Sequence, residues 1–71
     1  MAQRIVYKVT NADVLLGPDA EYRFRAPAAP AGSVATINVY GRPTRVRVCG
    51  HTVDDGPRGR VEAAEFVDVY L

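Results

Sequence analysis

Residues 33–49, SVATINVYGRPTRVRVC, contain the pattern that most constrains the fold of this chain. Apolar and polar side chains alternate on both sides of Gly41, Arg42 and Pro43. Because successive side chains of a strand point to opposite faces, each half predicts a strand with one apolar and one polar face. We therefore predict a β-hairpin that turns at residues 41–43. Its apolar face is expected to hold Ala35, Ile37, Val39, Val46 and Val48, and its polar face Thr36, Asn38, Tyr40, Arg45 and Arg47.

The rest of the chain predicts more strands. Alternation recurs at residues 3–10 and 21–25, whereas residues 60–71 fit both helix and strand spacing. Glu62 and the two alanines after it favour helix, and the β-branched and aromatic residues after Glu65 favour strand. We predict a strand from about Glu65, and a short helical turn near residues 60–65 stays open. About five short strands separated by turn signals indicate an all-β fold, a small antiparallel barrel or sandwich.

The chain has 71 residues, which predicts one small β domain over residues 1–71. A domain of this size buries only about 60% of the surface of its unfolded chain, so partners are a natural source of extra stability. Residues 26–32, APAAPAG, predict either a simple crossover connector or an exposed arm that lies on a neighbouring subunit. Residues 54–59, rich in Asp, Gly and Pro, predict an exposed loop.

Charge is unevenly distributed along the chain although its net value is only +1. Residues 22–53 contain five arginines and no acid, and all of the acids after this stretch lie between Asp54 and Asp68. Biased genome composition is the favoured explanation for the abundance of arginine. The functional alternative is a surface for bidentate contacts to carboxylates or phosphates, which suit the planar guanidinium group.

Cys49 and His51 are the residues with the most reactive chemistry in the chain. On a continuing strand they would face the same way, as a thiolate–imidazole pair requires. A free cysteine is more often a small apolar residue, and two ligands are too few for a structural zinc site without a symmetry mate. There is also no Gly-rich phosphate-binding motif. We therefore expect no enzyme activity, no catalytic residue, no metal and no cofactor.

The sequence favours a non-catalytic structural or interaction protein in a multi-copy assembly, such as a small virion component of a phage head or tail. Its expected partners are copies of itself or a larger assembly protein. The alternative is a small β-barrel that binds nucleic acid through an arginine-rich strand face. No leader or membrane-spanning run is evident, so we expect a cytoplasmic origin, with a virion as one destination. The candidate interaction residues are Arg23, Arg25, Tyr40, Arg42, Arg45, Arg47, Phe66, Asp68 and Tyr70.

Overall fold

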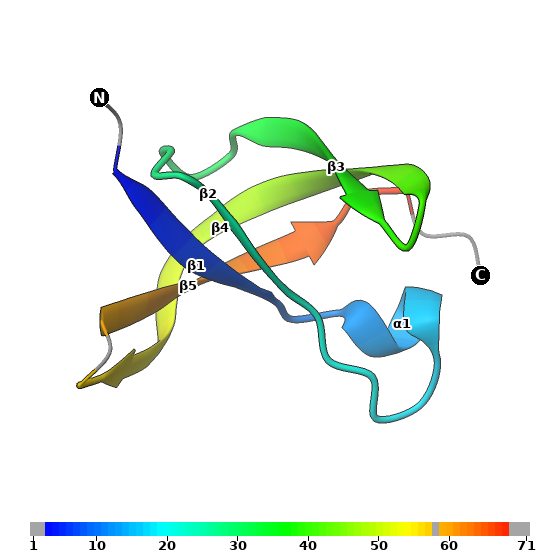
Figure 1. The fold of residues 1–71 in the computed structure, drawn as a ribbon, viewed down its shortest axis with the longest axis horizontal. Helices are drawn as coiled ribbons and strands as arrows, with labels where there is room; N and C mark the ends of the chain where they lie inside the picture. The colour runs from blue at the N-terminus through cyan, green and yellow to red at the C-terminus, as the bar shows by residue number, and fades with distance from the viewer. Residues whose placement is uncertain (1–2, 58, 69–71) are drawn as a thin grey trace.

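The computed structural model describes residues 3–57 and 59–68, which form one curled sheet with a single short helix (Figure 1). The strands are β1 (Arg4–Val9), β2 (Arg23–Pro27), β3 (Val34–Val39), β4 (Arg42–Gly56) and β5 (Gly59–Phe66), and helix α1 is Ala12–Leu16. Their order in the sheet is β2-β1-β5-β4-β3, so β2 and β3 are the two edges. The prediction of a small all-β fold with about five strands is confirmed. The sheet is a half-barrel, and it is not purely antiparallel, because β1 and β5 run parallel.

The predicted hairpin is present as β3 and β4, but its turn lies one residue earlier than expected. Val39 pairs with Arg42, which leaves Tyr40 and Gly41 as a two-residue turn. Both have positive φ, 50° and 86°, as a type I′ turn requires. The amide of Gly41 donates to Asn38 Oδ1 at 2.7 Å. Tyr40 therefore lies in the turn rather than on the polar strand face.

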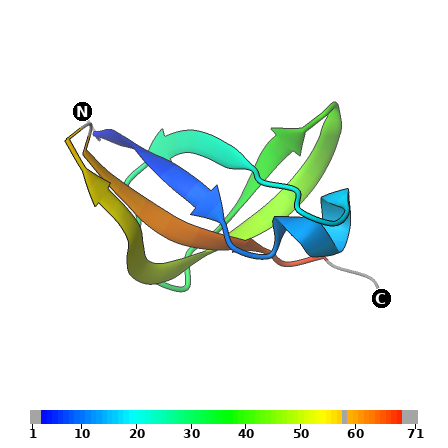
Figure 2. The same ribbon diagram turned by 90° about the horizontal axis from the view of Figure 1, so that it is seen from below.

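Strand β4 is long because it continues through residues expected to form a loop. It ends at Gly56, and β5 begins at Gly59, so residues 54–56 and 59 of the predicted 54–59 loop belong to strands instead. The β4–β5 register shifts between Val48 and Thr52, where Gly50 has φ 96°. Such bulges bend a strand, and this one lets β4 follow the curve of the half-barrel in Figure 2.

Strand β5 occupies residues 60–65, for which the sequence leaves a short helical turn open. It starts at Gly59 rather than at about Glu65 and ends at Phe66. Tertiary structure overrides the helix propensity of these residues, because β5 lies at the centre of the sheet and pairs with both β1 and β4. Ala63 and Ala64 are fully buried in this position. Their backbone hydrogen bonds and close packing outweigh an intrinsic preference that is worth less than about 1 kcal/mol per residue.

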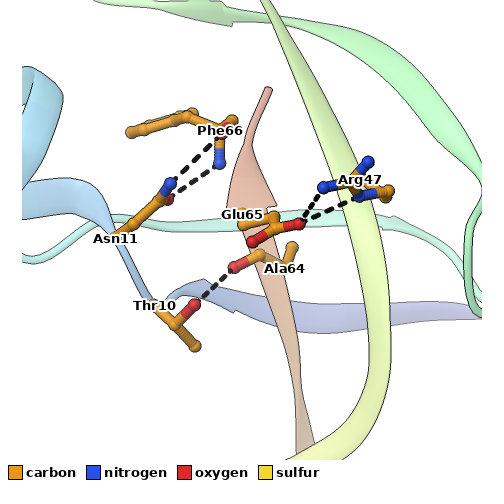
Figure 3. Close-up of polar contacts among 6 residues, drawn as sticks. All are labelled: Thr10, Asn11, Arg47, Ala64, Glu65 and Phe66. Atoms are coloured by element: carbon orange, nitrogen blue, oxygen red, sulfur yellow. Dashed lines mark hydrogen bonds and ion pairs between the residues drawn. The ribbon is translucent and has the colours of Figure 1, made fainter. Parts of the chain in front are cut away.

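The core lies inside the curl of the sheet and beneath α1. It is formed by buried Val9, Ala12, Val39, Val46 and Phe66, against which Leu16, Tyr22, Phe24 and Ile37 pack. The Asn11 side chain joins this region to the end of β5: its Oδ1 accepts from the Phe66 amide at 2.8 Å, and its Nδ2 donates to the Phe66 carbonyl at 3.2 Å (Figure 3).

The Pro- and Ala-rich segment is a crossover from one edge strand to the other. Pro27 still belongs to β2, so the connector starts later than residue 26. The amide of Ala29 donates to the Tyr7 hydroxyl at 3.1 Å, and the amide of Gly32 donates to the Val48 carbonyl at 2.8 Å. These bonds hold the connector on its own chain, as the crossover interpretation requires, rather than as an arm extended from it.

Candidate functional site

Arg45 and Arg47 lie on the outer face of β4, and each is paired with an acid of its own chain. Arg45 Nε donates to Asp68 Oδ2 at 2.8 Å, with a second bond from Nη2 to Oδ1. Arg47 donates from Nε to Glu65 Oε1 at 2.9 Å and also from Nη2 (Figure 3). The hydrogen bond from Arg45, reinforced by its charge, lowers the pKa of the Asp68 carboxyl.

These ion pairs show that the two arginines of the hairpin already bind acids of their own chain. Arg47 and Glu65 are direct neighbours across the β4–β5 ladder, so the pairing follows from register. The bidentate contacts to carboxylates that the sequence suggests for these arginines are made within one chain. A partner that used this face would first have to compete with Asp68 and Glu65 for the guanidinium groups.

Tyr40, Arg42 and Phe66, which were also predicted as interaction residues, lie in three different surroundings. Tyr40 is 78% exposed at the hairpin turn, where its ring meets the edge of the Tyr22 ring with centroids 5.7 Å apart. Arg42 is exposed at the start of β4. Phe66 is only 2% exposed and belongs to the core, so its prediction as an interaction residue is wrong. Tyr70 lies outside the described residues.

Arg23 and Arg25 lie on edge strand β2, which β1 and β5 separate from β4 in the sheet. Together with Arg60 they line a surface hollow of about 630 Å³ between β2 and the β4–β5 hairpin. Val6 and Val61 contribute apolar surface to the hollow, and Phe24, Pro57 and the two glycines of the hairpin turn complete it with Asp54. We call this region the arginine hollow.

No acid within residues 3–57 and 59–68 forms an ion pair with Arg23 or Arg25. Arg60 is partly satisfied, since its Nε lies 3.6 Å from Glu62 Oε2. Arg4 adds further positive charge nearby, because its Nη2 donates to the Arg25 carbonyl at 3.0 Å. Sequence reasoning identified Arg23 and Arg25 but missed Arg60, which is 35 residues from Arg25 and reaches the hollow only through the sheet topology.

The side-chain hydrogen bond of the Cys49 thiol is with Thr10, not with His51. Cys49 and His51 lie within the irregular part of the β4–β5 ladder, on either side of Gly50, and His51 is exposed while Cys49 is half-buried. Burial raises the pKa of the Cys49 thiol, and the Glu65 carboxylate raises it further. Both effects favour the protonated thiol, which is a poor nucleophile. In the described part of the chain, no three side chains of His, Cys, Asp or Glu are grouped as a metal site would require.

No protein-family model matches this sequence, and no curated protein or solved structure matches it either. Among the described residues there is no helix with the length and apolar character needed to cross a membrane.

Proposed function

We propose that this protein is a non-catalytic interaction protein that works in a multi-copy assembly, and that an acidic segment of a protein partner binds in the arginine hollow. The observation that carries the proposal is the state of Arg23 and Arg25, which face a concave surface without an acid partner among the described residues. The ion-paired Arg45 and Arg47 show that the same fold neutralises arginines elsewhere.

The geometry of β2 suits a peptide with acids at alternate positions. Residues two apart on a strand are about 7 Å apart and share a face, so Arg23 and Arg25 present two guanidinium groups in line. Each can take a carboxylate through two parallel hydrogen bonds. The apolar surface of Val6 and Val61 beside them favours a partner that also carries apolar side chains.

A direct test uses polyglutamate as the acidic probe. Arg25→Glu and Arg23→Glu are each expected to weaken binding at low salt by about tenfold, because each removes one charge-assisted pair and adds a repulsion. Arg42→Glu is the matched control, since it makes the same charge change at an exposed position of β4 outside the hollow. Equal loss in Arg42→Glu and Arg25→Glu would show a response to net charge alone and overturn the site.

Nucleic-acid binding is the second candidate function. The observation that favours it is the set of three guanidinium groups, from Arg23, Arg25 and Arg60, that line the arginine hollow. It is the weaker candidate because Asp54 lines the hollow and because Tyr40, the exposed aromatic among the candidate residues, is a turn residue that packs against Tyr22 and does not line the hollow. A single-stranded oligonucleotide should then bind with an affinity that falls steeply with salt. Tight, salt-dependent oligonucleotide binding that Arg25→Glu abolishes, with no binding of polyglutamate, would establish this second function in place of the first.

A virion is the setting that we propose for the assembly, because a small chain acting in many copies gains there the support that its own core lacks. The mass of the particle that co-purifies with the chain from its native source tests this setting. A strict monomer recovered without a partner would contradict both the assembly and the virion.

A further inference from the structure

The two edges of the half-barrel expose backbone groups whose positions follow from the ladder pattern. On β3, the Ser33 carbonyl accepts from the Val48 amide at 2.9 Å. In an antiparallel ladder alternate residues bond the neighbouring strand, so Ala35 and Ile37 bond β4 as Ser33 does. The backbone amides and carbonyls of the residues between them, Val34, Thr36 and Asn38, therefore point away from β4 to the free edge.

The free edge of β2 is protected against pairing. By the same alternation, Arg23, Arg25 and Pro27 point their backbone groups outward. Pro27 has no amide hydrogen, its carbonyl accepts from the Tyr7 hydroxyl at 3.4 Å, and the Arg25 carbonyl accepts from Arg4. Proline and charged side chains are the features by which edge strands avoid other strands. A second copy would also bring arginine against arginine here.

The free edge of β3 lacks this protection. Its sequence VATINV contains no charge and no proline, and Val34 is 53% exposed. Within the described part of the chain β3 pairs with β4 alone. The Tyr22 hydroxyl donates to the Asn38 carbonyl at 3.2 Å, whereas the Asn38 amide and the edge groups of Val34 and Thr36 have no partner among the described residues. Exposed edges of this kind are templates for another strand.

We propose that a second copy of this chain pairs along β3 in an antiparallel, two-fold arrangement centred on Thr36. This inference rests on the multi-copy assembly proposed above, but it uses other residues than the arginine hollow. Thr36 would lie opposite the partner's Thr36, Val34 opposite the partner's Asn38, and Ala35 opposite the partner's Ile37. The arrangement is isologous and closes on itself as a dimer.

The side chains around β3 favour a second copy over a strand of unrelated chemistry. No charged residue meets another across the proposed pairing, and Arg45 and Arg47 on the adjacent β4 are neutralised by their own acids. On the inner face, Ala35 of each copy would lie opposite the partner's Ile37. A small side chain would thus meet a large one at two symmetric positions. Beside Ala35, an almost wholly apolar hollow of about 260 Å³ offers space for that larger side chain, and it is lined partly by Val34, Val46 and Val48.

A charge-exchange experiment tests the dimer and its centre together. The wild-type protein should sediment as a concentration-dependent dimer. Thr36→Lys and Thr36→Glu should each weaken dimerisation at least tenfold, because each brings like charges together at the axis. An equimolar mixture of the two variants should recover the dimer, which a merely misfolded variant would not do. A wild-type protein that stays monomeric up to about 1 mM, or a mixture that does not recover, overturns the proposal.

Hydrogen exchange provides a second readout with a proline control. In the dimer the Thr36 amide should be protected, and its protection should increase with protein concentration, whereas the Arg23 amide on β2 should exchange rapidly throughout. Thr36→Pro should abolish the dimer, while Arg25→Pro, the matched change on the other edge, should retain it. A dimer that survives Thr36→Pro would place the interface elsewhere. Polyglutamate binding by Thr36→Lys reports on the arginine hollow separately, so failure of one proposal leaves the other readable.

Discussion

Arg45 and Arg47 on β4 and Arg23 and Arg25 on β2 are two pairs with the same spacing and opposite surroundings. In each pair the residues alternate with apolar ones and share the outer face of a strand. β4 lies inside the sheet, where β5 places Glu65 opposite Arg47. β2 is an edge whose one neighbour, β1, places Lys8 opposite Arg23 and contributes Arg4 nearby.

The comparison shows that an arginine pattern acquires its role from the adjacent strand. Where acids lie on the adjacent strand or just beyond its end, as Glu65 and Asp68 do, the arginines form ion pairs of modest value to stability. Where the neighbour is basic and the other side is open, the positive charge remains available to a ligand. The fold thus divides two similar pairs into a structural set and a candidate binding set.

The largest expected effect comes from removing the anchor that holds β5 beside β4. Phe66 is buried in the core next to Glu65, so Phe66→Ala should lower the free energy of unfolding by about 3–5 kcal/mol. Denaturant unfolding followed by circular dichroism measures it. A loss below about 1 kcal/mol would contradict the core position and restore Phe66 as a surface residue.

A smaller loss is expected when the bulge that sets the β4–β5 register is strained. Gly50 has φ 96°, and a Cβ placed there would lie 2.5 Å from Ala31 Cβ in the connector. Gly50→Ala should therefore cost about 2–4 kcal/mol, from backbone strain and from overpacking. Gly41→Ala is the control, because its φ is also positive but its added Cβ would meet nothing within 4 Å. Equal losses in the two variants would show that contact with the connector is unimportant.

The contrast between the two arginine pairs itself predicts different costs of truncation. Arg47→Ala should lower the free energy of unfolding by about 0.2–1 kcal/mol, because it removes a surface pair with Glu65. Arg25→Ala should leave stability within about 0.5 kcal/mol of wild type, since it removes no ion pair of the described chain. Conversely, Arg25→Ala should weaken polyglutamate binding and Arg47→Ala should not. The reversed pattern would exchange the roles assigned to the two pairs.

The hairpin was predictable from sequence because its information is local. Alternation around Gly41 defines two strands and their inner faces, and the structure confirms Val39 and Val46 as core. The one-residue error in the turn also has a local cause. Tyr40 adopts a positive φ, which is not expected of a tyrosine from the sequence.

The role of the last strand was not predictable, because it depends on neighbours distant in sequence. Nothing local marks Ala63 and Ala64 as the centre of a sheet, and their helix propensity argued against it. The register that pairs Glu65 with Arg47, and the curl that brings Arg60 to the arginine hollow, are both consequences of that strand. The prediction of site residues therefore failed for the charged side chains whose neighbours depend on how β5 pairs.

The smallest effect concerns the ionisation of Asp68, which reports on its pair with Arg45 alone. The hydrogen bond from Arg45 lowers the Asp68 pKa in the folded state, so the pair stabilises the fold above the unfolded-state value of about 3.9 and is lost as pH falls through the lower folded pKa. Carboxyl chemical shifts during an acid titration measure that pKa directly. Arg45→Ala should raise it toward the ordinary value, whereas Arg47→Ala should leave it lowered, because Arg47 is paired with Glu65. If both variants raised it equally, the two arginines of β4 would act as one diffuse positive field rather than as two separate pairs, and the distinction between the neutralised face and the arginine hollow would be one of degree.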